Sequence, residues 1–133
     1  MKDILTVLKS MPSFTIIKGS SQFGVPDKKI QMAEEELGLK FTDEYKKYVS
    51  SFGAVTYEGH ELTGICDFKQ LNVVDVTLEE RRYFPGVPAD YYVVEDTHID
   101  GIIIWQSKDG SVYVNTHGCL KKIAGSLSEY IQG

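Results

Sequence analysis

Histidine and cysteine are the residues of this chain that could hold a metal ion, so their spacing is the first test for chemistry. The 133-residue chain contains three histidines, His60, His98 and His117, and two cysteines. Metal sites often contain a local pair such as H-x-x-x-H or C-x-x-C. No such pair occurs here, and the nearest arrangement is His117-Gly118-Cys119. We therefore expect no metal ligands and interpret the histidines as solvated residues of turns.

One arrangement keeps a metal-dependent reaction open as a hypothesis. His98 and Asp100 form a second candidate pair, and His117 could supply a third ligand, which would suit a small metal-dependent hydrolase. Nucleophilic catalysis has less support, because there is no G-x-S-x-G motif and neither Cys66 nor Cys119 lies in a nucleophile signature. A general acid/base pair among the nineteen acidic residues stays open, since sequence alone cannot locate one. We predict a protein that is not an enzyme, with no catalytic residues and no cofactor.

The glycines do not form a phosphate-binding loop. They are isolated from one another, whereas such a loop needs several glycines in a short run. We interpret five of them as turn residues whose positive φ angle requires glycine, namely Gly59, Gly64, Gly101, Gly110 and Gly118.

Net charge and hydropathy exclude two further classes of partner. Fourteen basic and nineteen acidic residues give a net charge of −5 and an isoelectric point near 5.1, whereas proteins that bind nucleic acid need a positive surface. Direct binding of DNA or RNA is therefore not expected. No apolar run approaches the ~20 residues that cross a bilayer, and the N-terminus lacks the pattern of a secretory signal. We expect a cytoplasmic protein with two free thiols and no membrane association.

A basic protein partner remains, and the acidic residues show where it could bind. Glu95, Asp96 and Asp100 lie in a segment that we expect to be a loop between strands, and Glu58 and Glu61 lie in a second hairpin. Solvated loops are the alternative interpretation, but an acidic patch would accelerate and select the binding of a basic partner. An outward tyrosine beside it could act as an anchor. The expected partner-binding residues are Tyr57, Glu58, Glu61, Glu95, Asp96 and Asp100.

Helices are predicted in the first part of the chain by apolar spacing and capping residues. One helix should span residues 3–11 and end at Pro12. The next should begin at Pro26 and end at Gly38, a glycine typical of a left-handed cap. Thr42 should cap a third helix that ends at Gly53. Residues 14–17 suit a short extended piece, and 19–24 a mobile surface loop.

The second half of the chain is predicted to be rich in β-strands. Residues 54–65 suit a hairpin with Glu58-Gly59 at its turn, and three strands are expected at 91–95, 102–106 and 111–114, with a fourth at 120–123. Residues 71–76 suit either a strand or a helix. Capping-box spacing predicts short helices that begin at Thr77 and Ser126. The pattern indicates one α+β domain over residues 1–133, with a twisted, mainly antiparallel sheet flanked by short helices.

The predicted helix pair also resembles a known family. Its apolar, cap and turn residues resemble the opening signature of the SUKH superfamily, the Smi/Knr-type proteins. The resemblance rests on Ile30-x3-Glu34-x2-Leu37-Gly38, then Phe41-Thr42-Asp43-Glu44-Tyr45-Lys46-x-Tyr48, then Phe52-Gly53. It continues through Gly64-Ile65, Asp100-Gly101, Asp109-Gly110 with Val112-Tyr113, and Ser126-Leu127-x-Glu129-Tyr130-Ile131. The pattern covers about residues 26–131, and departs from the family where Phe41-Thr42 replaces Leu-Pro and Ala54 replaces a small turn residue.

The resemblance implies a SUKH-like α+β fold and a binding role without catalysis. Bacterial members of this kind are immunity proteins, antitoxins that neutralise a polymorphic toxin. The expected partner is therefore a cognate protein toxin, a nuclease or deaminase, whose basic substrate groove the immunity protein covers. The alternative is an adaptor or regulatory scaffold, the role of fungal relatives in cell-wall signalling, because a fold does not determine a function. The sequence predicts neither the identity of the toxin nor the oligomeric state.

Overall fold

The computed structural model describes residues 3–17, 24–99 and 101–133. Two expectations fall outside these ranges, because most of the loop at 19–24 and the whole of Asp100 are not described. The helices in the described residues are α1 (Ile4–Ser10), α2 (Asp27–Leu37), α3 (Asp43–Phe52), α4 (Val73–Tyr83) and α5 (Leu127–Gln132), with a 3₁₀ turn at Lys69–Leu71. The strands are β1 (Thr15–Ile16), β2 (Val55–Tyr57), β3 (His60–Glu61), β4 (Tyr92–Asp96), β5 (Ile102–Gln106), β6 (Val112–Thr116) and β7 (Cys119–Ala124).

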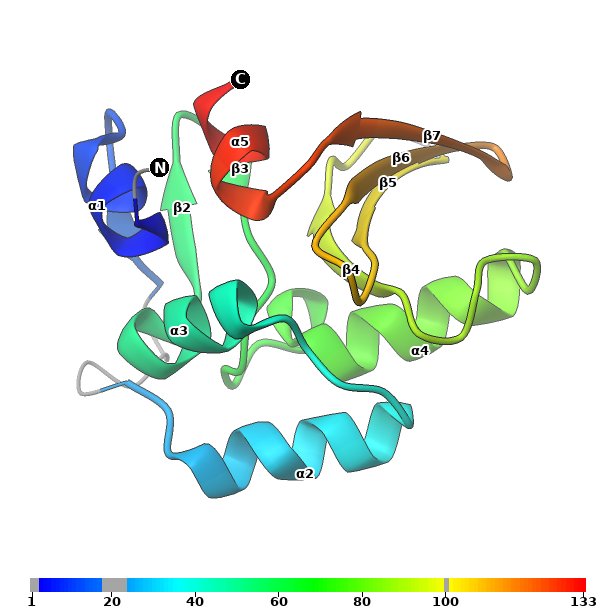
Figure 1. Ribbon diagram of the computed structural model, residues 1–133, viewed down its shortest axis with the longest axis horizontal. Coiled ribbons are helices and arrows are strands. Elements are labelled where there is room, and N and C mark those ends of the chain that lie inside the picture. Colours follow the sequence, from blue (N-terminus) through cyan, green and yellow to red (C-terminus); the bar gives the residue numbers. More distant parts are fainter. Residues whose placement is uncertain (1–2, 18–23, 100) are drawn as a thin grey trace.

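The strands form two antiparallel sheets in the order β1-β2-β3 and β4-β5-β6-β7. A single antiparallel bridge between Leu62 and Glu95 joins the end of β3 to β4. Figure 1 shows α5 beside the three-stranded sheet, and α4 running below the curved four-stranded sheet. The predicted α+β class and antiparallel pairing are confirmed, and the four late strands occur close to their expected positions. The described helices are all too short to traverse a bilayer.

Each face of the four-stranded sheet packs on its own apolar cluster. Side chains alternate between the faces of a strand, and the register places Val93 opposite Trp105 and Asp96 opposite Ile103. Trp105 and Ile103 pack with α4 in a small cluster. The opposite face joins the main core, which also contains Tyr45 and the other buried residues of α1, α2, α3 and α5.

The α2–α3 pair forms as the sequence predicts, because its signals are local. Gly38 ends α2 with φ of 69° in the left-handed region, and the Thr42 hydroxyl accepts a hydrogen bond from the amide of Tyr45. Later in the chain, Tyr92 at the start of β4 is buried, whereas the adjacent Tyr91 is partly exposed.

The predicted start of α4 at Thr77 is wrong. The helix begins at Val73, which resolves the ambiguous segment 71–76 as mostly helix, and Thr77 lies fully buried inside it. The Val73 amide donates to the carbonyl of Gly64, and the Thr77 hydroxyl accepts a bond from the amide of Val93 on β4. Burial of Val73, Val74 and Val76 begins the helix one turn early, because tertiary packing outweighs a local capping pattern.

Gly64 is required for a reason other than the predicted positive φ. The other four glycines of that group do have positive φ, but Gly64 does not. A Cβ built on Gly64 would come within 1.7 Å of the carbonyl oxygen of Gly53. The chain therefore needs glycine there so that two backbone segments can approach closely.

Helix α5 is held against α3 by one carboxylate. Glu44, in the first turn of α3, accepts hydrogen bonds from the amides of Leu127 (2.7 Å) and Ser128 (3.0 Å) and from the Ser128 hydroxyl (2.6 Å). The Ser126 hydroxyl caps the same helix by accepting from the amide of Glu129. Two caps, one local and one from a helix 83 residues away in sequence, therefore determine where the C-terminal residues lie.

Candidate functional site

Most of the predicted partner-binding residues meet where the β2–β3 hairpin approaches β4. At the centre is Glu95, which is only 3% exposed. Its carboxylate accepts a hydrogen bond from the Tyr130 hydroxyl of α5 at 2.5 Å and pairs with Nδ1 of His60 at 2.8 Å. Glu95 belongs to β4, as the strand predicted at 91–95 indicates, and Asp96 is the last residue of the same strand, so the assignment of these two residues to a loop is wrong. A bulge between Val93 and Glu95 turns the Glu95 side chain away from Trp105 and towards α5.

Tyr57 packs against His60, one of the two residues that contact Glu95. Its ring stacks on the ring of His60 with centroids 5.0 Å apart, and Tyr57 is 2% exposed. Burial, and then the negative charge of Glu95, raise the pKa values of both Tyr57 and Tyr130 well above the usual value for tyrosine. Tyr130 therefore keeps its proton and is the donor to Glu95.

The outer layer of the site is acidic and accessible. Nε2 of His98 lies 3.0 Å from Oε1 of Glu61, and both side chains are about half exposed. Asp96 accepts a hydrogen bond from the amide of His98 at 2.8 Å. Glu58 is exposed at the β2–β3 turn, where it and Gly59 both have positive φ, as a two-residue hairpin turn requires. We call Glu58, Glu61 and Asp96 the acidic surface.

Burial divides the predicted residues into two groups. Glu58, Glu61 and Asp96 present carboxylates to solvent, whereas Tyr57 and Glu95 lie beneath them. Asp100 lies outside the described residues. Contact with a partner stays a prediction for all six. The sequence interpretation missed the supporting roles of His60 and Tyr130, and no local signal could have found them, since the partners are 35 residues apart along the chain.

The remaining candidates for chemistry are the other two histidines and the two cysteines. His98 pairs with Glu61, whereas His117 is exposed in the β6–β7 turn, where its amide donates to Gly101. Within the described ranges, no group of three His, Cys, Asp or Glu side chains is arranged to hold a metal ion. Both cysteines are free: Cys119 is exposed, and Cys66 is partly buried with a pKa raised mainly by that burial.

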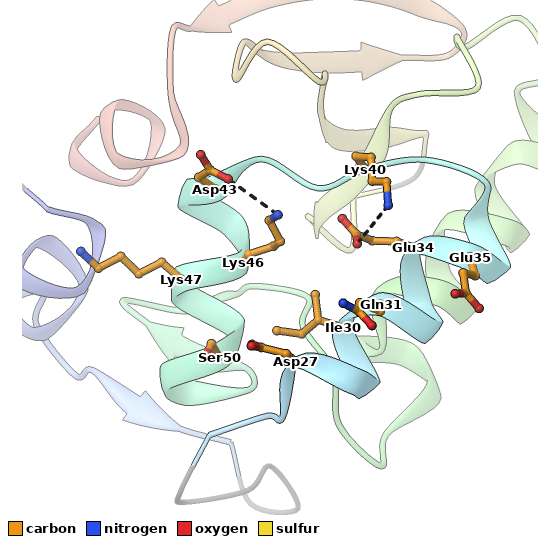
Figure 2. A pocket seen from close by; sticks show the side chains of 10 residues that line it. All are labelled: Asp27, Ile30, Gln31, Glu34, Glu35, Lys40, Asp43, Lys46, Lys47 and Ser50. Atoms are coloured by element: carbon orange, nitrogen blue, oxygen red, sulfur yellow. Dashed lines mark ion pairs between the residues drawn. The ribbon is translucent and has the colours of Figure 1, made fainter.

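A cavity of about 650 Å³ between α2 and α3 is a weaker candidate for a binding site. Its lining carries charges of both signs, and two pairs of them lie close together: Lys40 is 4.0 Å from Glu34 and Lys46 is 3.7 Å from Asp43 (Figure 2). Lys47 points away from the cavity in this view and pairs with Asp3, the residue before α1. A groove whose opposite charges are paired with each other offers little attraction to a charged partner.

Replacing Tyr130 with phenylalanine is expected to destabilise the protein by about 1.5–3 kcal/mol, the usual range for a hydrogen bond to a charged group. The substitution removes one donor from the buried carboxylate of Glu95 and leaves the ring in place. The free energy of unfolding from urea titration measures the effect. Tyr83→Phe is the matched control, because Tyr83 is 68% exposed and should tolerate the change within about 0.5 kcal/mol. Equal effects of the two substitutions would contradict a stabilising role for the hydrogen bond between Tyr130 and Glu95.

Comparison with known proteins agrees with the resemblance seen in the sequence. The family model SUKH_5, described as SMI1-KNR4 cell-wall, matches residues 1–133. A search of curated proteins found no match. Because the family match spans every residue of the α+β fold described above, the chain belongs to the SUKH_5 family of SMI1-KNR4 domains.

Proposed function

We propose that this protein is an immunity protein that binds and neutralises a cognate polymorphic toxin, with a nuclease or deaminase domain as the target. The observation that carries the proposal is the SUKH_5 match over residues 1–133, because SUKH families typically act as immunity proteins for such toxins. Membership of the family also favours a role without catalysis.

The acidic surface supplies a physical mechanism. Enzymes that act on nucleic acids bind their substrates through basic grooves. Glu58, Glu61 and Asp96 present negative charge on neighbouring strands and turns, in a chain whose net charge is −5. A protein that places these carboxylates over a basic groove competes with the phosphates of the substrate. The pair formed by buried Glu95 and exposed His60 then holds the β2–β3 hairpin against β4.

The experiment is co-expression with a candidate cognate toxin, followed by a measured affinity. Cells that carry both proteins should grow, and Glu58→Lys with Glu61→Lys should weaken binding at least tenfold and reduce its salt dependence. The control is Glu35→Lys with Glu36→Lys, which changes the net charge equally on an exposed part of α2. Continued killing when both proteins are made in soluble form would contradict the immunity role, and equal effects of the two double variants would contradict the surface.

A scaffold for an endogenous partner is the second candidate, because the matching family is described by its cell-wall proteins. A scaffold would use the same surfaces, but it would bind several partners, whereas an immunity protein would bind one. Affinity purification from the source cells should recover one stoichiometric partner for an immunity protein, and several weakly bound partners for a scaffold.

A further inference from the structure

A groove of about 560 Å³ borders the acidic surface on the side of α4. It opens between the C-terminal half of α4 and the β4–β5 hairpin, so Asp96 and His98 belong both to this groove and to the site above. The residues that line it are Glu80 and Tyr83 from α4, Phe84 directly after that helix, and Asp96, His98, Ile99, Gly101 and Ile103 from the hairpin.

The rim of the groove exposes unusual apolar area. Tyr83 is 68% exposed and Ile99 is 61% exposed, the highest values among the large hydrophobic side chains of the described residues. Ile103 is buried next to them and belongs to the apolar cluster between α4 and the four-stranded sheet. An exposed tyrosine that lies beside apolar side chains, one of them buried, is typical of the residues that anchor a protein partner.

The charges in the groove are all of one sign. Glu80 and Asp96 belong to opposite walls, and partial burial, followed by the negative charge of Asp96, raises the pKa of Glu80. The described lining residues contain no lysine or arginine, and His98 directs its ring nitrogen Nε2 to Glu61. The two carboxylates therefore repel each other across a partly desolvated space, and a bound cation would relieve that repulsion.

We propose that this groove receives an arginine side chain of the toxin. The proposal rests on the function proposed above and identifies one of the contacts by which the partner is held. A guanidinium group can bond a carboxylate through two parallel N–H donors and stack on an aromatic ring at the same time. Glu80 and Asp96 supply the carboxylates, Tyr83 supplies the ring, and Ile99 covers the aliphatic part of the side chain. Lysine fits less well, because its ammonium group has no planar face to stack.

The test uses the isolated full-length protein and a probe of known chemistry. N-acetylarginine amide is titrated to about 100 mM, a range that detects the weak binding of one side chain, while ¹H–¹⁵N NMR spectra record the backbone amides. N-acetylcitrulline amide is the control probe, because it has nearly the same shape and no charge. Arginine should shift the amides of the groove residues, and citrulline should not. Equal shifts with the two probes, shifts spread over every acidic part of the surface, or no shifts at all would each overturn the proposal.

Two sets of variants test the assigned residues. Glu80→Gln with Asp96→Asn removes both charges and keeps the side-chain shapes, so the apparent Kd for the arginine probe should rise about fivefold or more. Tyr83→Ala should raise it about threefold. Glu79→Gln is the matched control, because Glu79 is an exposed carboxylate of α4 that does not line the groove. A cooperative thermal unfolding transition, close to that of the unmodified protein, shows that each variant is folded. An effect of Glu79→Gln as large as that of the double variant would overturn the assignment.

The outcomes separate this proposal from the immunity role. If the groove variants still neutralise the toxin fully while Glu58→Lys with Glu61→Lys does not, the groove proposal is wrong and the immunity role stands. If no toxin is neutralised, the immunity role is wrong, and a specific arginine titration still identifies the groove as a site for a basic partner.

Discussion

Replacing Glu44 with alanine is expected to reduce the free energy of unfolding by about 3 kcal/mol. The substitution leaves two amides at the start of α5 and the Ser128 hydroxyl without their acceptor, and removes a negative charge from the positive end of that helix. Because α5 carries Tyr130, the loss should also loosen the bond to Glu95 in the candidate site. Urea denaturation measures the stability, and hydrogen exchange of the Leu127 and Ser128 amides reports the local effect.

The matched control for this substitution is Asp43→Ala. Asp43 precedes Glu44 in the chain, has a fully exposed side chain and pairs with Lys46 at 3.7 Å. Exposed ion pairs of this kind contribute little, so the change should stay within about 0.5 kcal/mol. If Asp43→Ala and Glu44→Ala had equal effects, or if exchange in α5 were unchanged by Glu44→Ala, the proposed attachment of α5 would be contradicted.

Replacing Trp105 with alanine is expected to cost about 3–5 kcal/mol, the range for a fully buried large aromatic residue. Trp105 is 0% exposed and packs with Val76, Val93 and Ile103 in the cluster between α4 and the four-stranded sheet. Its indole nitrogen has no hydrogen-bond partner among the described residues, so the loss is one of packing. Because α4 carries Glu80 and Tyr83, the variant should also weaken binding of the arginine probe.

Trp105→Phe provides the control, because it keeps an aromatic ring and loses no hydrogen bond. We expect it to cost about 1–2 kcal/mol. Far-UV circular dichroism is the appropriate measurement, since Trp105 is the single tryptophan of the chain and its fluorescence is lost in both variants. A cost for Phe equal to that for Ala would indicate that packing of the ring does not determine the stability of this cluster.

The sequence predicted the elements whose signals lie within a few residues of one another. Gly38 and Thr42 define the ends of α2 and α3 through backbone geometry and a hydrogen bond that spans three residues. Hairpin turns were found in the same way, since Glu58-Gly59 satisfies its own backbone requirement. The ordered series of these caps, turns and core residues was also enough to identify the family, which the match over the whole chain confirms.

The start of α4 and the reason for Gly64 show where local signals fail. Thr77 has capping-box spacing, but a helix that began there would leave out the valines before it, which are buried by packing in α4. Gly64 looks like a turn glycine, but its constraint is the backbone of Gly53, which lies eleven residues earlier. Neither contact has a signature in the neighbouring sequence.

The candidate site depended on the tertiary structure even more strongly. The sequence was sufficient to place carboxylates and tyrosines in the hairpins, to give a negative net charge and to indicate a SUKH-like domain. It did not predict that Glu95 is buried against His60 and Tyr130, or that Asp96 and Glu80 line the same groove. Exposure and charge proximity depend on which strands and helices pack together. Those contacts join residues 16 or more positions apart, beyond the range of any cap, turn or helical period.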